Sequence, residues 1–181
     1  MDPHAVDGRV SQGWGGTPPH GVHVNVVLAA RGTATAASMT AAFAAPTAGF
    51  TPIVISLGPD QPSYETLQPP TIMLNKMPIG SPAHETLVFG ACQVGIARGV
   101  LDSVAEGLLR GDQETLVFVS LWLGEDAGDG EAVCAAARQA TAAAVREAVV
   151  GRSEADVQRL VDRRDTVTHP FHDDAQGGSG G

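Results

Sequence analysis

Residues 22–30 read VHVNVVLAA. Valine occupies every second position from residue 22 to residue 26, while His23 and Asn25 lie between the valines. Successive side chains of a strand point to opposite faces of the sheet. The alternation therefore predicts a strand with one buried apolar face and a polar stripe that carries His23 and Asn25.

Strand and helix patterns follow one another on both sides of this stretch without a long linker. The predicted strands cover residues 22–30, 51–57, 71–77 and 115–123, and the predicted helices cover residues 33–45, 82–110, 131–150 and 153–163. This order predicts one α+β domain in which a two-layer arrangement places the helices on one face of the sheet. We expect a flexible N-terminal arm over residues 1–20, the domain over 21–172 and a disordered tail over 173–181.

Composition and charge exclude several classes of function. The chain has 181 residues, of which 43% are apolar, and its formal net charge is −9, which argues against nucleic acid or an anionic membrane as a partner. The sequence shows no uninterrupted run of 18 apolar residues and no signal-peptide pattern, so we expect a cytoplasmic protein. The two cysteines have neither a disulfide framework nor a zinc-site spacing. Nucleotide-binding glycine motifs are also missing from the sequence.

Three polar residues are candidates for chemistry. Of the eleven basic residues only Lys76 is a lysine, and a lysine is not interchangeable with an arginine at a site. His23 can exchange a proton near neutral pH, although a structural histidine under a loop or in a subunit contact fits the same pattern. Gln93 lies in an apolar helical segment, where its amide either bonds to the backbone or faces a ligand.

Five segments, in order, resemble the formaldehyde-activating enzyme family over residues 22–171. They are His23-Val24-Asn25, GFTPIVISLGPD (49–60), TIMLNK (71–76), VFGACQVGIARGVLDSVAEG (88–107) and Thr168-His169-Pro170-Phe171. The resemblance implies that formaldehyde condenses with tetrahydromethanopterin to a methylene pterin and water, in one-carbon metabolism or formaldehyde detoxification. It also implies a fold like the second domain of ribosomal protein S5, with a left-handed crossover. The family forms a homopentamer that binds the pterin between subunits and requires no metal or other cofactor.

The resemblance also assigns roles to single residues. It implies that His23 is the catalytic residue, and that the substrate contacts are made by Asn25, Val54, Lys76, Pro78 and Gln93. Asn25 replaces an aspartate of the family and Pro78 replaces a threonine, and the loop before residue 71 is longer. These departures are expected to weaken or redirect use of the pterin. The alternatives are therefore the same chemistry on a different amine and aldehyde, or a non-catalytic ligand-binding homologue.

Overall fold

The computed structural model describes residues 1–170 and 172, and it divides the chain into two compact units, Met1–Val150 and Gly151–Gly181. The first unit contains η1 (Pro3–Val6), β1 (Val10–Gly15), β2 (Val22–Ala30), α1 (Ala34–Ala44), β3 (Pro52–Val54), β4 (Ser56–Leu57), η2 (Gln61–Ser63), β5 (Glu65–Thr66), β6 (Thr71–Asn75), α2 (Pro82–Thr86), η3 (Leu87–Cys92), α3 (Gln93–Ala105), β7 (Thr115–Leu123) and α4 (Gly130–Val150). The second unit contains α5 (Glu154–Asp162) and η4 (Arg164–Thr166).

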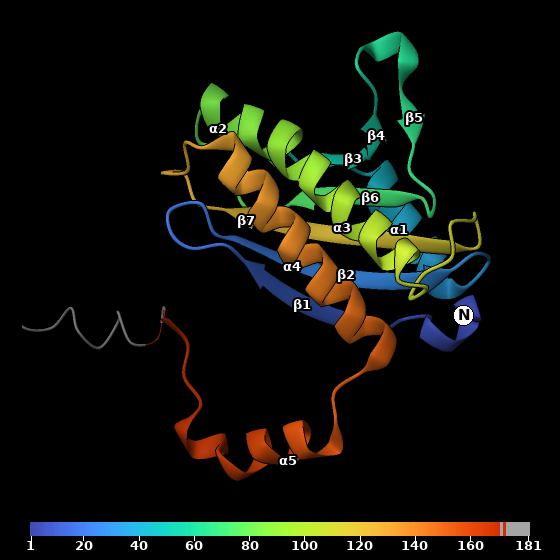
Figure 1. Cartoon of the computed structure of the whole chain (residues 1–181), viewed down its shortest axis with the longest axis vertical. Helices are drawn as coiled ribbons and strands as arrows, with labels where there is room; N and C mark the ends of the chain where they lie inside the picture. The colour runs from blue at the N-terminus through green and yellow to red at the C-terminus, as the bar shows by residue number, and fades with distance from the viewer. Residues whose placement is uncertain (171, 173–181) are drawn as a thin grey trace, which may run out of the picture. The chain divides into compact units, whose positions relative to one another are not determined.

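A mixed five-stranded sheet forms the centre of the first unit (Figure 1), in the order β1-β2-β7-β6-β3. All neighbouring strands are antiparallel except β6 and β7, which run parallel. β4 and β5 form a separate two-stranded ribbon that projects from the sheet (Figure 1). The predicted α+β class is confirmed, and so is the strand over residues 22–30.

One face of the sheet packs against α3 and α4, which lie side by side over it (Figure 1). Val22, Val24 and Val26 of β2 and the alternate residues of β7 point into this layer and are fully or almost fully buried. β1 lies so close to α4 that a Cβ atom on Gly13 would collide with the carbonyl oxygen of Ala140, and one on Gly15 with that of Ala136. By length and composition alone the helix Pro82–Ala105 could cross a membrane, but its buried residues belong to this core.

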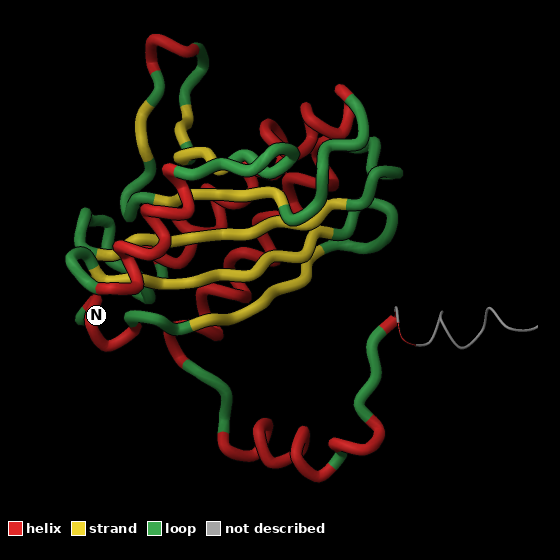
Figure 2. The backbone as a smooth tube through the Cα atoms, turned by 180° about the vertical axis from the view of Figure 1, so that it is seen from behind, coloured by secondary structure: helices red, strands yellow, loops and turns green. Residues whose placement is uncertain are grey.

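The opposite face of the sheet is only partly covered, as Figure 2 shows from behind. There α1 packs over Phe118, Val27 and Ile72 at one end of the strands. Helices therefore occupy both faces, and the expectation that they all lie on one face is wrong. The reason is that α1 follows β2 directly and buries its own small apolar surface on the outer face. The remainder of this outer face carries the polar stripe of β2.

Residues 1–20 are not a loose arm. β1 pairs antiparallel with β2 along its whole length, and Val6 of η1 is buried. The glycines that suggest a loop instead permit close packing, since β1 lies directly on the backbone of α4. The strand expected over residues 51–57 is divided into β3 and β4. The predicted tail, residues 173–181, lies outside the described residues.

Candidate active site

Strand register places a row of polar and aromatic side chains on the outer face of the sheet. His23 on β2 pairs with Trp14 on β1 and with Trp122 on β7. Asn25, two residues further along β2, pairs with Gln12 and Ser120 in the same way. Directly paired residues of neighbouring strands point to the same face of a sheet. The polar stripe predicted from the sequence therefore exists and extends over three strands.

Lys76 comes to this face from the end of β6. Its backbone N–H donates to the carbonyl oxygen of Leu121 at 2.6 Å, which continues the pairing of β6 with β7. The buried side chain of Asn75 holds the segment after β6 to the loop before β3, because its amide nitrogen donates to the carbonyl oxygens of Met77 and Gly49. Asn75 Oδ1 also accepts from the backbone N–H of Thr51 at 3.2 Å.

Lys76 joins the two polar residues of β2 into one hydrogen-bonded group. Its Nζ atom lies 2.7 Å from His23 Nδ1 and 2.7 Å from Asn25 Oδ1. The other ring nitrogen, His23 Nε2, lies 3.1 Å from Gln12 Oε1. An ammonium group that donates to Nδ1 requires the neutral ring to carry its proton on Nε2, and Gln12 Oε1 is placed to accept it. The group thus holds one mobile proton between Lys76 and His23.

Burial brings the pKa of the Lys76 ammonium group closer to neutral pH. Desolvation lowers the pKa of Lys76 from 10.5 to about 8. The two groups that contact Nζ, a ring nitrogen and an amide oxygen, carry no negative charge that would counter this effect. A lysine with a pKa in this range loses and regains its proton within the physiological range of pH, which suits proton transfer to His23.

Both tryptophans of the chain stand beside His23. The Trp14 ring lies 6.5 Å from the His23 ring and 6.0 Å from the Trp122 ring, measured between centroids, and both pairs are tilted. Trp14 is partly exposed but fixed, because its Nε1–H donates to the carbonyl oxygen of Gly16 at 3.0 Å and its ring lies against Gly21. The indoles form an aromatic wall, defined as Trp14 and Trp122, against which a flat ring can stack.

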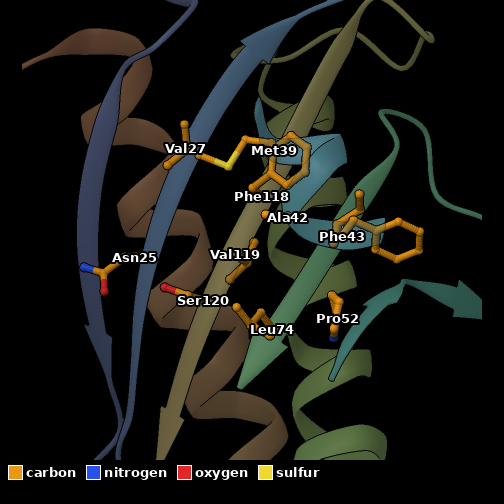
Figure 3. A pocket seen from close by; sticks show the side chains of 11 residues that line it. Asn25, Val27, Met39, Ala42, Phe43, Pro52, Leu74, Phe118, Val119 and Ser120 are labelled. Atoms are coloured by element: carbon orange, nitrogen blue, oxygen red, sulfur yellow. The ribbon is translucent and has the colours of Figure 1, made fainter. Parts of the chain in front are cut away.

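An apolar pocket of about 170 Å³ adjoins the polar group on the outer face (Figure 3). Asn25 and Ser120 provide its polar end, and α1 covers it with Met39 and Phe43. The rest of the lining is apolar and comes from α1 and from strands β2, β3, β6 and β7 of the sheet. The site therefore combines a proton-exchanging pair, an aromatic wall and a largely apolar recess.

The other three predicted contacts are not part of this hydrogen-bonded group. Val54 is half-buried on β3 opposite Ile72. Pro78 is exposed two residues after Lys76. Gln93 lies at the start of α3, where its Nε2 donates to the carbonyl oxygen of Phe89 at 2.9 Å and its Oε1 accepts from the Ser56 N–H at 3.4 Å. The backbone alternative for Gln93 is thus the one seen within this chain.

Sequence reasoning missed three residues of the site, namely Gln12, Trp14 and Trp122. The first two lie in β1, whose glycines masked an alternating pattern in which Gln12 and Trp14 share a face. Trp122 lies in a correctly predicted strand, where its even spacing from Ser120 could have placed it on the outer face. Among residues 1–170 and 172 the structure shows no cluster of three or more metal-ligating side chains.

Comparison with known proteins identifies the family of the chain. Residues 14–172 match the formaldehyde-activating enzyme (Fae) family. A 5,6,7,8-tetrahydromethanopterin hydro-lyase from Methanosarcina barkeri is 32% identical over 159 residues, which cover 86% of this chain and 85% of that protein. A bifunctional enzyme Fae/Hps from Methanothrix thermoacetophila is 23% identical over 86% of this chain, but the match covers 38% of that longer protein. A match of this extent shows that the chain belongs to the formaldehyde-activating enzyme family.

Proposed function

We propose that this protein condenses formaldehyde with tetrahydromethanopterin, giving the methylene pterin and water. The observation that carries the proposal is the hydrogen-bonded group of His23, Lys76 and Asn25 on the outer face of the sheet. Family membership and the similarity to a tetrahydromethanopterin hydro-lyase support the choice of substrates.

The chemistry needs an acid at one step. A pterin nitrogen adds to formaldehyde and forms a carbinolamine, whose hydroxyl group leaves as water only after protonation. His23 supplies this proton, and Lys76 replenishes it through the contact of 2.7 Å between Nζ and Nδ1. The iminium then closes on the second pterin nitrogen, which is held in the same site and therefore needs no further encounter.

The surroundings of His23 suit a pterin. The aromatic wall offers a stacking surface beside the acid, and the adjacent recess takes apolar parts of the carrier. We assign Asn25, Val54, Lys76, Pro78 and Gln93 as substrate contacts on the family pattern. Gln93 makes its hydrogen bonds with Phe89 and Ser56 of its own chain, so its assignment rests on the family pattern alone.

We further propose a cytoplasmic homopentamer with a site between subunits, and a fold of the kind found in the second domain of ribosomal protein S5. The mixed sheet with one parallel pair, β6 and β7, is compatible with that fold. Light scattering tests the assembly, and a monomer at micromolar concentration would refute the shared site.

Asn25 favours a second candidate function, the same condensation on another reduced pterin or amine. Here a neutral amide faces Lys76, where the family has a carboxylate that would pair with it. Pro78 offers neither a hydroxyl nor a backbone N–H to a substrate. Parallel assays with tetrahydromethanopterin and tetrahydrofolate separate the two candidates.

The decisive experiment compares His23→Asn with His20→Asn. The condensation rate is measured with tetrahydromethanopterin after subtraction of the spontaneous reaction. We expect His23→Asn to lose at least a hundredfold in kcat, within the range by which general acids contribute. His20→Asn, in the loop before β2, should keep the wild-type rate. Equal rates for the wild type and His23→Asn would refute the mechanism.

A further inference from the structure

The lone lysine is placed to do more than contact the substrate. We propose that the ε-amine of Lys76 attacks formaldehyde and forms a methylene iminium, which then transfers its carbon to a pterin nitrogen. This inference rests on the proposed function for its second half, whereas the first half needs formaldehyde alone. It makes Lys76 the nucleophile of the first step, in addition to the proton donor of His23.

The contact between Lys76 Nζ and His23 Nδ1 is the geometric basis of the proposal. At 2.7 Å a proton can pass from the ammonium group to the ring nitrogen. That single transfer produces a neutral amine and a protonated imidazole at the same time. The first is the nucleophile that attacks an aldehyde, and the second is the acid that removes water from the adduct. One proton transfer therefore prepares both reagents at neighbouring positions.

Burial and charge favour the neutral amine. With its pKa lowered to about 8 by desolvation, roughly a tenth of Lys76 side chains are unprotonated at pH 7, against fewer than about one in a thousand at the ordinary value. Desolvation is an established way to activate a lysine for Schiff-base chemistry. Asn25 accepts a hydrogen bond from Nζ at 2.7 Å and orients the amine without adding a negative charge that would hold its proton.

The steps balance in atoms and protons. The amine forms a C–N bond to formaldehyde, and an amine proton moves to the oxygen, which gives a carbinolamine. Protonated His23 gives its proton to the hydroxyl group, water leaves, and the iminium carries the positive charge. A pterin nitrogen adds to the methylene carbon, its proton moves to the lysine nitrogen, and the C–N bond to Lys76 breaks. Ring closure on the second pterin nitrogen releases a proton that restores the ammonium group.

The composition of the chain makes this adduct easy to detect. Lys76 carries the single side-chain primary amine, so the chain's α-amino group is the other amine available. The α-amino group is therefore an internal reference, and preferential reaction of Lys76 reports acceleration by its surroundings.

The first experiment traps the iminium without any pterin. The protein is treated with isotopically labelled formaldehyde and sodium cyanoborohydride, which converts an iminium to a methylamine, and peptide mass spectrometry measures methylation at both amines over time. We expect Lys76 to be methylated at least tenfold faster than the α-amino group, and this preference to disappear in His23→Asn. Methylation of Lys76 at or below the rate of the reference overturns the proposal.

The second experiment separates the amine from its charge. Lys76→Cys is alkylated either with bromoethylamine, which restores a primary amine, or with bromoethyl-trimethylammonium, which restores a charge that cannot attack formaldehyde. The introduced thiol should react first, because Cys92 and Cys134 are buried and burial raises the pKa of Cys92 to about 12. We expect Lys76→Cys to lose at least a hundredfold in condensation rate, and only the amine to recover tenfold or more. Equal recovery with both groups, or none with the amine, overturns the proposal.

The two experiments also distinguish failure of the inference from failure of the proposed function. Accelerated condensation without selective methylation of Lys76 removes the covalent step and leaves the direct reaction with His23 as acid. Selective methylation of Lys76 without accelerated condensation supports the iminium and removes the pterin as its acceptor.

Discussion

Replacement of Lys76 by methionine removes a charge that the fold holds partly away from water, and we expect the variant to be more stable than the wild type at pH 7. Methionine keeps a similar length and an apolar stem, so the packing changes little. His23 and Asn25 lose a partner, but both are only half-buried and can bond to water. A residue kept for catalysis at the expense of stability should behave in this way.

The magnitude follows from the pKa of Lys76. The decrease from 10.5 to about 8 corresponds to about 3 kcal/mol as an upper limit. Because Lys76 is half-buried, solvent screening reduces this to roughly 1 kcal/mol. The unfolded chain binds the proton more tightly than the folded one between about pH 8 and pH 10.5, so the free energy of unfolding of the wild type rises with pH across this window.

Urea unfolding followed by circular dichroism at pH 7 and pH 10 measures both effects. Lys76→Met should be more stable by roughly 1 kcal/mol at pH 7, and the difference should shrink at pH 10 as the wild type gains stability. Arg31→Met, which removes an exposed cation, should show no such change with pH. The reasoning fails if Lys76→Met is less stable at pH 7 or if its difference from the wild type does not depend on pH.

Three further outcomes test the packing and the site. Gly13→Ala should destabilise the fold by about 1–3 kcal/mol in urea unfolding, because its Cβ meets the backbone of α4, whereas Gly128→Ala has open space and should be neutral. Trp14→Leu should raise the KM for the pterin at least fivefold and abolish part of the quenching of intrinsic fluorescence by bound pterin, since both tryptophans of the chain lie beside His23. Asn25→Asp combined with Pro78→Thr should lower the KM for tetrahydromethanopterin tenfold or more, by restoring two polar contacts of roughly 1–3 kcal/mol each, and an unchanged KM would show that the two departures are neutral.

Local patterns predict the strands and helices that are regular in sequence. The alternation in residues 22–30 identifies β2 and its polar face, and a serine at position 153 marks the start of α5, where its hydroxyl oxygen accepts from the Asp156 N–H. β1 escapes this reasoning because Gly13 and Gly15 read as loop residues. These two glycines are needed for close packing against α4, which follows more than a hundred residues later in the sequence.

The candidate site is predictable as separate residues but not as a group. His23 and Asn25 share a face by simple periodicity, yet the contact of Lys76 with His23 joins residues 53 positions apart. That contact depends on the order of strands in the sheet and on the hydrogen bonds of the buried Asn75 side chain to the backbone of Gly49 and Thr51. No local sequence pattern encodes either of them. The pKa of Lys76 depends in turn on the burial that this arrangement creates.

Asn25 therefore connects substrate binding with the reactivity of Lys76. A carboxylate at this position would form an ion pair with the ammonium group and raise the pKa of Lys76 towards its ordinary value. Asn25→Asp alone should then reduce reductive methylation of Lys76 at pH 7 by at least tenfold, while any gain in pterin binding appears in KM. If Lys76 only contacts the substrate, the same variant should have a lower KM without a loss in kcat. A fall in both methylation and kcat, together with a lower KM, would show that the neutral amide at position 25 keeps Lys76 reactive at the expense of affinity for the carrier.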